Sequence, residues 1–296
     1  MVNDLLMRTT TLGNTALAVS AIGFGAMHFS LAERPSEAQG FDVLHRVLDL
    51  GVTFIDTADA YCRDEADKHH NERFLRKALA TYSGDTSRIV VATKGGCMRP
   101  GGSWTRNGSP DHLRRTIRES HAALGGERPI TLWQHHAIDP EYPVDVSMAP
   151  VREAVRDGLI RFVGVSNYSV EQIKRARDVV EVVSVQNQYS PWHRRPEQDG
   201  VLDYCEEEGL TFLPWSPLGG RSRAKRLGQI DGLATLAREK DVSPQRLVIA
   251  WLMARSPCIL PIPGSSRRAN AEDLLAAVDV TLSREEVQRI DNAVSG

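Results

Sequence analysis

Short apolar runs alternate with longer amphipathic segments along most of the chain. Runs rich in β-branched and aromatic residues predict eight buried strands, at 21–26, 53–58, 89–94, 130–134, 160–165, 182–186, 210–215 and 259–262. Segments with apolar residues on one face predict helices at 38–50, 71–82, 110–124, 149–157, 169–178, 198–208, 230–240, 243–254, 270–277 and 283–294. Eight strand–helix units in 296 residues predict the α/β class and one closed (β/α)8 TIM barrel, a single domain over residues 1–296.

Three segments fall outside this alternation. Before the first strand, two β-prone runs at 8–12 and 16–19 flank Gly13-Asn14, a turn signal that predicts an N-terminal β-hairpin. The segment 219–226, rich in Gly, Ser and Arg, is predicted to be a loop, and so is the glycine-rich stretch 95–102.

The overall charge narrows the classes of partner. A formal net charge of −2 provides no basic field for nucleic acid or for a membrane surface, so we expect a small-molecule substrate. The four cysteines have no metal-ligand spacing, which predicts reduced thiols and no metal site. Residues Met1–Leu6 do not begin an export signal, and no run is long and apolar enough to span a membrane, so we expect a cytoplasmic protein. Nothing in the sequence indicates an oligomeric state.

Polar residues stand where the predicted strands end. The second to seventh strands are followed in turn by Asp56, Lys94, His136, Ser166-Asn167, Gln186 and Trp215, and the eighth by Gly264. In a closed barrel these positions converge on one mouth. Any one of them has an ordinary structural explanation, such as a hydrogen-bonded core histidine, but their joint placement favours an active site.

The second and third strands bring together an acid, a phenol and an amine. Tyr61 lies five residues after Asp56, and Lys94 ends the next strand. A phenol with a pKa of about 10 is a poor acid, but a nearby ammonium lowers that pKa, while a carboxylate holds the ammonium in place. We therefore expect Tyr61 to be a tuned proton donor. The charged run 62–73 follows directly and is predicted to be a solvated loop that overhangs the mouth.

These residues resemble those of the aldo-keto reductase family. Phe54–Tyr61 resembles its D-x-x-x-x-Y signature, Ala92–Lys94 its third-strand lysine, and His135–Pro140 its H-x-x-D-P segment. Further segments that resemble the family are Gly164–Tyr168, Val185–Tyr189, Trp215–Gly219 and Ile262–Ser265. The resemblance covers nearly the whole chain and is closest to short microbial, NADPH-dependent members.

The resemblance implies a carbonyl reductase that uses NADP(H) to reduce an aldehyde or ketone. The catalytic residues would be Asp56, Tyr61, Lys94 and His136, with Tyr61 donating a proton and His136 orienting the carbonyl or helping to relay that proton. Ser166, Asn167 and Gln186 would hold the nicotinamide carboxamide, and Trp215 would stack on the ring. The other implied cofactor residues are Ser216, Pro217, Leu218, Gly264, Ser265, Arg267, Arg268 and Asp273.

The chain departs from the family pattern at several points. Cys62 stands where glycine often follows the tyrosine, and Glu272-Asp273-Leu274 replaces a common Glu-Glu-Asn. The usual lysine and arginine for the cofactor phosphate are absent, so Arg267 or Arg268 would have to take their place. Because a guanidinium can bind a 2′-phosphate bidentately, we predict NADPH over NADH, with Ser265 and Arg267 as the preferred ligands.

Two other function classes remain open, and the substrate is only loosely bounded. The barrel could be a non-catalytic NADP(H)-sensing module, or a lyase that forms a Schiff base on Lys94. Trp104, Trp192 and Met27 are expected to border the mouth together with the loop at 62–71. These residues suit an aldehyde with an aromatic or apolar body and some polar groups. The resemblance of Ile262–Ser266 to short microbial members of the family implies a pyridoxal-type or sugar-derived aldehyde as a candidate substrate.

Overall fold

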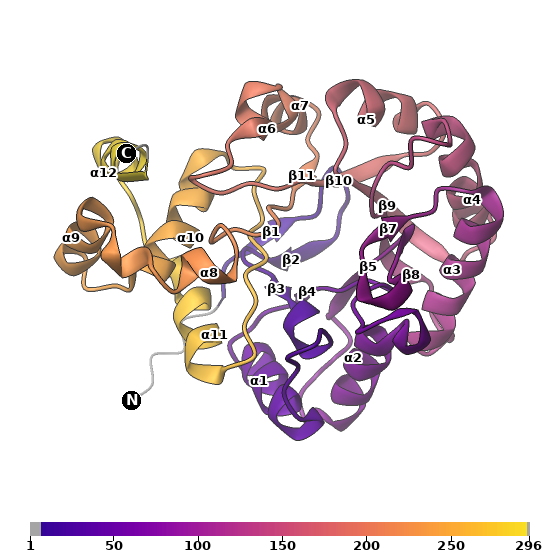
Figure 1. Ribbon diagram of the computed structural model, residues 1–296, viewed down its shortest axis with the longest axis horizontal. Helices are drawn as coiled ribbons and strands as arrows, with labels where there is room; N and C mark the ends of the chain where they lie inside the picture. Colours follow the sequence, from indigo (N-terminus) through magenta and orange to yellow (C-terminus); the bar gives the residue numbers. More distant parts are fainter. Residues whose placement is uncertain (1–6, 295–296) are drawn as a thin grey trace.

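A curled parallel sheet forms the centre of the molecule (Figure 1). The computed structural model describes residues 7–294. The sheet contains β3 (Phe24–Gly25), β4 (Phe54–Asp56), β5 (Val90–Gly95), β8 (Ile130–His135), β9 (Ile160–Ser166), β10 (Val182–Gln186) and β11 (Thr211–Phe212). Each strand pairs in parallel with the one that precedes it in this series. All their carboxyl ends therefore lie at one end of the barrel.

The eighth predicted strand, 259–262, is an extended segment instead of a regular strand. Leu260 N–H donates to the Phe212 carbonyl (2.9 Å), and Gly23 and Gly25 N–H donate to the carbonyls of Pro261 (2.8 Å) and Pro263 (2.9 Å). The two prolines have no N–H with which to return these bonds, so the ladder is irregular. The segment nevertheless joins β11 to the chain at β3 and closes the barrel.

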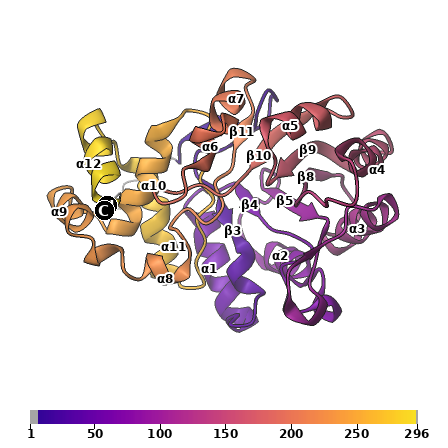
Figure 2. The ribbon, with the colours of Figure 1, turned by 45° about the horizontal axis from the view of Figure 1, so that its top comes forward.

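Helices surround the sheet, and serine side chains begin several of them. They are α1 (Glu37–Asp49), α2 (His70–Thr81), α3 (Pro110–Ala123), α4 (Val144–Arg156), α5 (Val170–Arg177), α6 (Arg195–Gln198), α7 (Val201–Glu207), α8 (Arg221–Ala224), α9 (Asp231–Glu239), α10 (Pro244–Arg255), α11 (Arg268–Leu275) and α12 (Arg284–Val294). Ser36, Ser109, Ser169 and Ser243 each accept a backbone N–H as N-cap. Figures 1 and 2 show α9 and α12 side by side, outside the ring formed by the other helices.

The observed helices differ from the prediction in three places. The predicted helix 198–208 is two short helices, α6 and α7, because Gly200 between them has a φ of 76°. Helix α4 begins at Val144, five residues earlier than expected, and continues through Pro150. Val144 and Met148 in its first part are buried. The predicted loop 219–226 contains α8.

The glycine-rich loop 95–102 is the first part of a small hairpin that projects from the barrel. It contains the short 3₁₀ helix Pro100–Gly102, and it leads into an antiparallel pair formed by β6 (Cys97–Met98) and β7 (Thr105–Arg106). Trp104 lies just before β7, so this hairpin carries one of the aromatic residues expected at the mouth.

The predicted N-terminal hairpin is confirmed, and it covers one end of the barrel. Strand β1 (Thr9–Thr11) pairs antiparallel with β2 (Ala18–Ser20). Leu12 and Val19 belong to the apolar cluster inside the barrel, together with Phe54, Val90, Ala92, Leu132, Val183, Leu213, Leu260 and Ile262. Gly13 N–H donates to Thr211 Oγ1 (2.7 Å), at the start of β11. The hairpin therefore closes the amino ends of the strands, and the carboxyl ends form the opposite mouth.

A search of the described part of the chain finds neither membrane-spanning helices nor metal clusters. No helix within residues 7–294 is both long and apolar enough to cross a bilayer. In the same range, no three His, Cys, Asp or Glu side chains are grouped so that they could hold a metal ion. Met1–Leu6, on which the prediction about export partly depends, lie outside the described residues.

Candidate active site

A fully buried lysine organises the barrel mouth. The parallel register pairs Asp56, the last residue of β4, with Ala92, so Lys94 lies two residues further along β5. Lys94 Nζ donates to Asp56 Oδ2 (2.7 Å), to the Thr57 carbonyl (2.7 Å) and to the Tyr61 hydroxyl (3.0 Å). The structure thus brings together the acid, phenol and amine expected from the sequence, and all three N–H donors of the ammonium are used.

Asp56 is fixed on its other side by Gln186. Gln186 Nε2 donates to Asp56 Oδ1 (2.8 Å), and Gln134 Nε2 lies 3.5 Å from the same oxygen. Sequence reasoning did not anticipate the contact with Gln186. The contact links β10 to β4 across the barrel, and it leaves Gln186 Oε1 pointing away from the hydrogen bond as an acceptor.

Burial, more than Lys94, determines the protonation of Tyr61. Desolvation raises the pKa of Tyr61 to about 12, because it outweighs the opposing effect of the Lys94 ammonium. Lys94 lowers this pKa, as expected, but the net shift is upward. Burial alone would lower the pKa of Lys94, yet Asp56 and Tyr61 raise it above its ordinary value. At neutral pH the phenol therefore keeps its proton beside a charged ammonium.

His136 completes the polar wall of the site in its neutral form. Burial, with the positive charge of Lys94, holds the pKa of His136 well below its usual range. Its ring lies nearly perpendicular to that of Tyr61, with centroids 5.9 Å apart, and its Nδ1 is buried with no partner among residues 7–294. A neutral imidazole at this place can donate one hydrogen bond to an oxygen held in front of Tyr61.

Three of the predicted nicotinamide residues form one hydrogen-bonded group. Asn167 has a φ of 62°, unusual for a residue other than glycine, and its Nδ2 donates to the His136 carbonyl (3.0 Å) and Ser166 Oγ (3.1 Å). Trp215 Nε1 donates to Asn167 Oδ1 (3.0 Å), which fixes the indole beside β9. Ser216–Gly219 form a turn directly after this tryptophan, closed by Gly219 N–H to the Ser216 carbonyl (2.9 Å).

The loop after the eighth strand contains the predicted phosphate ligands in two different situations. Arg267 N–H donates to Ser265 Oγ (3.1 Å), and the Arg267 guanidinium donates to the Asn270 side-chain oxygen (3.0 and 3.2 Å) but forms no ion pair with a carboxylate in the described range. Arg268, in contrast, pairs with Asp42 and Glu272, both at 3.3 Å. Gly264 packs so closely on the Gly25 backbone that an added Cβ would lie 2.1 Å from the Gly25 carbonyl oxygen.

Asp273 is turned away from this loop and toward α10. Its carboxylate accepts a hydrogen bond from the Ser243 hydroxyl (2.5 Å) and pairs with Arg246 (2.9 Å). These contacts hold α11 against α10. Both oxygens of Asp273 are therefore engaged by α10, while Ser265 and Arg267 remain in the loop.

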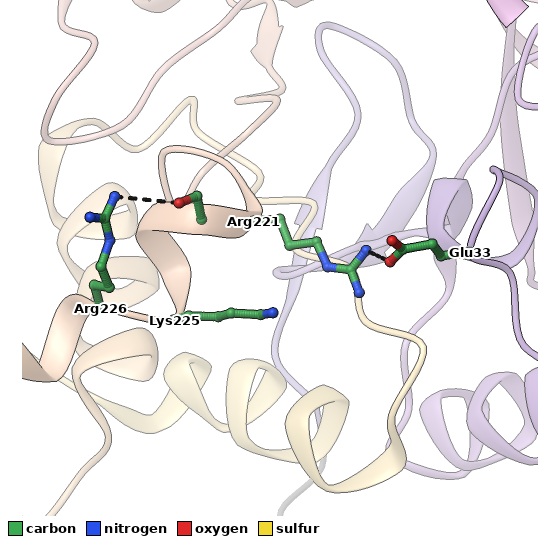
Figure 3. A pocket seen from close by; sticks show the side chains of 5 residues that line it. Glu33, Arg221, Lys225 and Arg226 are labelled. Atoms are coloured by element: carbon green, nitrogen blue, oxygen red, sulfur yellow. Dashed lines mark hydrogen bonds and ion pairs between the residues drawn. The ribbon is translucent and has the colours of Figure 1, made fainter.

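Sequence reasoning missed a basic cavity next to this region. Arg221, Ser222, Lys225 and Arg226 line a cavity of about 590 Å³, and Glu33, after β3, forms an ion pair with Arg221 across it (Figure 3). The signal was present, because 221–226 contains four basic residues in six positions. The Gly and Ser residues of this segment, however, predict only a loop.

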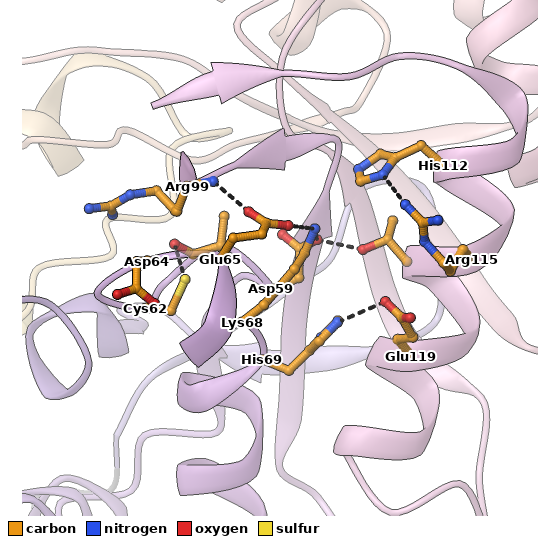
Figure 4. A network of polar contacts seen from close by, with 12 residues as sticks. Asp59, Cys62, Asp64, Glu65, Lys68, His69, Arg99, His112, Arg115 and Glu119 are labelled. Carbon is orange, nitrogen blue, oxygen red and sulfur yellow. Dashed lines mark hydrogen bonds and ion pairs between the residues drawn. The ribbon is translucent and has the colours of Figure 1, made fainter. Parts of the chain in front are cut away.

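A second missed feature is a polar network around the buried Asp59, two residues before Tyr61 (Figure 4). Asp59 accepts a hydrogen bond from Thr116 (2.5 Å) and pairs with Lys68 (3.4 Å), and burial raises the pKa of Asp59 to about 6. His69 donates to the buried Glu72 (2.6 Å) and pairs with Glu119 of α3 (3.2 Å). Part of the charged run 62–73 is therefore packed against α3, and the prediction of a wholly solvated loop is wrong.

Comparisons with known proteins agree with the barrel and its mouth. The family model described as the aldo/keto reductase family matches residues 21–295. An uncharacterised oxidoreductase of Schizosaccharomyces pombe is 36% identical over 280 residues, which cover 93% of this chain and 87% of the relative. Pyridoxine 4-dehydrogenase of Escherichia coli is 31% identical over 294 residues, covering 96% and 97%.

Solved structures give the same result. An aldo-keto reductase from Bacillus halodurans in its holo form is 27% identical, has a TM-score of 0.78 and covers 97% of this chain and 96% of its own. A thermostable aldo-keto reductase in complex with the inhibitor epalrestat is 26% identical, with a TM-score of 0.80 and coverage of 97% and 100%. The chain therefore belongs to the aldo/keto reductase family, and it is an oxidoreductase.

Proposed function

We propose that the protein reduces an aldehyde or ketone to an alcohol with NADPH as hydride source and Tyr61 as proton donor. The observation that carries the proposal is the position of Lys94 Nζ, which lies within hydrogen-bond distance of Asp56, the Thr57 carbonyl and the Tyr61 hydroxyl. This arrangement holds one protonated phenol at the mouth with a fixed direction for its O–H.

The residues around Tyr61 have the protonation states that carbonyl reduction needs. A phenol with a pKa of about 12 keeps its proton until the carbonyl oxygen becomes basic. As negative charge develops on that oxygen, the Lys94 ammonium, 3.0 Å from the Tyr61 oxygen, stabilises the phenolate left after proton transfer. Neutral His136 donates to the same carbonyl oxygen and orients it.

The donor set of the mouth fits a nicotinamide dinucleotide. When bound, this cofactor supplies the hydride. Ser166, Asn167 and Gln186 present hydroxyl and amide groups for the carboxamide, and the Trp215 indole, fixed by Asn167, offers a flat face for the ring. Ser216, Pro217 and Leu218, in the turn directly after this tryptophan, would extend the cofactor site.

The proposed preference for NADPH rests on the basic groups at the far end of the mouth. Arg267 has no carboxylate partner within residues 7–294, whereas Arg268 is shared between Asp42 and Glu272. Arg267 and Ser265 are therefore the proposed ligands of the 2′-phosphate, and Arg268 and Asp273 support the helix. Lys225 and Arg226 of the basic cavity, which form no ion pair with a carboxylate within residues 7–294, suit the other phosphates.

The proposed substrate is an aldehyde with an aromatic body. The rings of Trp104, Tyr61 and His136 lie edge to face at the mouth, which gives a flat substrate apolar surface on one side. The E. coli relative is named for its action on pyridoxine. Pyridoxal is therefore the first substrate to test, followed by benzaldehyde and by sugar-derived aldehydes.

The two rival functions receive less support. A Schiff-base nucleophile must lose a proton, yet Asp56 and Tyr61 raise the pKa of Lys94, and all three of its N–H donors are engaged. A purely sensing role would not require Tyr61, Lys94 and His136 to meet at one point.

The test is a panel of pyridoxal, benzaldehyde, glyceraldehyde and acetone with NADPH, followed by absorbance at the wavelength of the reduced cofactor. We expect aldehyde-dependent NADPH consumption, with aromatic aldehydes preferred. In parallel, each aldehyde is treated with borohydride in the presence of the enzyme. Covalent labelling of Lys94 without NADPH turnover would favour the lyase, and NADPH binding without turnover of any aldehyde would favour the sensing module.

A further inference from the structure

Arg99 is a buried cation that forms no ion pair through its guanidinium in the described part of the chain. It follows β6 and is only 8% exposed. Its Nε and Nη2 donate to the Gly102 carbonyl (3.1 and 2.7 Å), and Nη2 also donates to the Arg63 carbonyl (3.4 Å). Nη1 is buried and has no hydrogen-bond partner among residues 7–294. Glu65 accepts from the Arg99 backbone N–H (2.7 Å) and not from the side chain (Figure 4). Such a charge is costly to bury unless another group stabilises it.

The group that stabilises it is the ring of Trp104. The Arg99 guanidinium carbon lies 4.2 Å from the centre of that ring, a close cation–π contact. Trp104 is 50% exposed and is the one large hydrophobic side chain in the described residues that is markedly exposed. Exposing half of an indole and burying a cation beside it both cost free energy of folding. This cost indicates that the position of Trp104 serves a function.

Trp104 is positioned beside the proposed catalytic pair. Its ring centre lies 6.4 Å from that of Tyr61 and 6.0 Å from that of His136, at interplanar angles of 84° and 72°. A substrate whose carbonyl oxygen meets Tyr61 and His136 therefore places its next few atoms against this indole. The exposed part of the ring is the part that such a substrate can contact.

We propose that Arg99 is a positioning residue that holds Trp104 as a wall of the substrate site, and that this wall selects carbonyl compounds with a flat aromatic body. The inference rests on the proposed reductase function, which it deepens. Arg99 joins three segments: the loop after Tyr61 through Arg63, the turn at Gly102, and the hairpin that carries Trp104. The planar fork of a guanidinium can serve two carbonyls while its face stacks on an indole, whereas an ammonium cannot do both.

The test compares Arg99→Met, Trp104→Leu and the double variant with the wild type, using benzaldehyde and hexanal as substrates with NADPH. For benzaldehyde we expect Arg99→Met and Trp104→Leu each to raise KM roughly tenfold. The value of kcat should stay within about threefold, because the contact is made equally in the ground and transition states. KM for hexanal should change by less than about twofold, and the double variant should match Trp104→Leu, because Arg99 acts through the ring.

Arg106→Met is the matched control, since Arg106 is an exposed arginine on the same hairpin that makes one long contact, to the Ile138 carbonyl (3.4 Å). It should leave both substrates unaffected. Equal increases in KM for both aldehydes, or additive effects in the double variant, would overturn the proposal. Should Arg99→Met unfold at a lower temperature than the wild type, Arg99→Lys provides the second test. It keeps the charge, loses the fork, and should also raise KM for benzaldehyde.

A measurement without turnover separates this proposal from the reductase function. Acrylamide quenching of Trp104, taken as the difference between each protein and its Trp104→Phe counterpart, should increase in Arg99→Met because the indole is no longer held. Unchanged quenching would overturn the positioning role even if aldehydes are reduced. A wild type that reduces neither aldehyde would instead refute the proposed function, and with it the substrate preference, while the quenching result still decides whether Arg99 positions Trp104.

Discussion

The environment of Tyr61 combines two opposing influences on one hydroxyl group. Burial disfavours the phenolate, and the Lys94 ammonium at 3.0 Å favours it. Because burial is the larger influence, Tyr61 is protonated in the free enzyme, and the phenolate forms only when a carbonyl oxygen takes that proton. The Asp56 carboxylate accepts hydrogen bonds from Lys94 Nζ and from Gln186 Nε2. These bonds keep the ammonium and the carboxylate in place as the charge moves.

These protonation states predict the pH dependence of reduction. Tyr61 must be protonated, and an acid with a pKa raised to about 12 loses activity only as the pH rises toward that value. His136 must be neutral. Because its pKa is lowered, His136 becomes protonated, and activity falls, only as the pH drops well below 6.5. We therefore expect kcat/KM for the aldehyde, at saturating NADPH, to change by less than about twofold between pH 7 and 10. A fall in kcat/KM centred near pH 8 would show that a different group donates the proton.

Single arginines should also decide the choice of cofactor. We expect Arg267→Ala to weaken NADPH binding by roughly ten- to a hundredfold, which corresponds to about 1.5–3 kcal/mol, and to leave NADH binding unchanged. Arg268→Ala is the control, because its guanidinium is already paired with Asp42 and Glu272. Fluorescence titration with each cofactor measures both constants. A larger effect at Arg268 would reverse the assignment, and equal wild-type affinity for NADH and NADPH would remove the preference.

Among the elements, the segment 259–263 closes the barrel although two of its residues are prolines, which cannot donate backbone hydrogen bonds. Closure depends on the N–H groups of Gly23 and Gly25, which donate to the two proline carbonyls. It also depends on the absence of side chains, because Gly264 lies directly against the Gly25 backbone. The loop that contains the proposed phosphate ligands is thereby attached to β3 as well as to the segment 259–263.

This contact makes Gly264 sensitive to the smallest substitution. Gly264→Ala places a Cβ 2.1 Å from the Gly25 carbonyl oxygen, so one of two paired backbones must move, at a cost of roughly 1–3 kcal/mol in unfolding free energy. Gly228→Ala is the control, since a Cβ there meets nothing within 4 Å. Urea denaturation should show a lower midpoint for Gly264→Ala and little change for Gly228→Ala. Equal midpoints would mean that the barrel closes without this contact.

The elements also show which features can be predicted from sequence. Elements with a clear apolar run or a clear apolar face, such as β9 and α3, lie within one or two residues of their predicted positions. The break at Gly200 and the start of α4 at Val144 are not evident from the sequence, because neighbouring helices and the buried residues decide where a helix begins and whether one glycine ends it. The eighth strand was placed correctly along the chain, but its irregular pairing depends on prolines that accept hydrogen bonds without returning them.

In the whole molecule, different kinds of residue occupy the two ends of the barrel. The N-terminal hairpin fills the end where the strands begin, and the polar residues gather at the other end. The order of polar residues along the chain was sufficient to predict that Asp56, Tyr61 and Lys94 would meet. The net upward shift in the pKa of Tyr61 could not be predicted, because burial is a property of the assembled barrel. The Arg99–Trp104 contact was equally hidden, since neither residue has a periodic pattern around it.

The most direct test of the central claim compares wild type with Tyr61→Phe in the reduction of benzaldehyde, using NADPH deuterated at nicotinamide C4. The phenylalanine ring keeps the shape of the site and removes only the hydroxyl group. The account predicts deuterium on the carbinol carbon of the wild-type product, and a loss of at least about a hundredfold in kcat for Tyr61→Phe. It also predicts that NADPH binding stays within about threefold, because the hydroxyl group is not a proposed cofactor ligand. Equal rates in the two proteins, or a product without deuterium at that carbon, would contradict it.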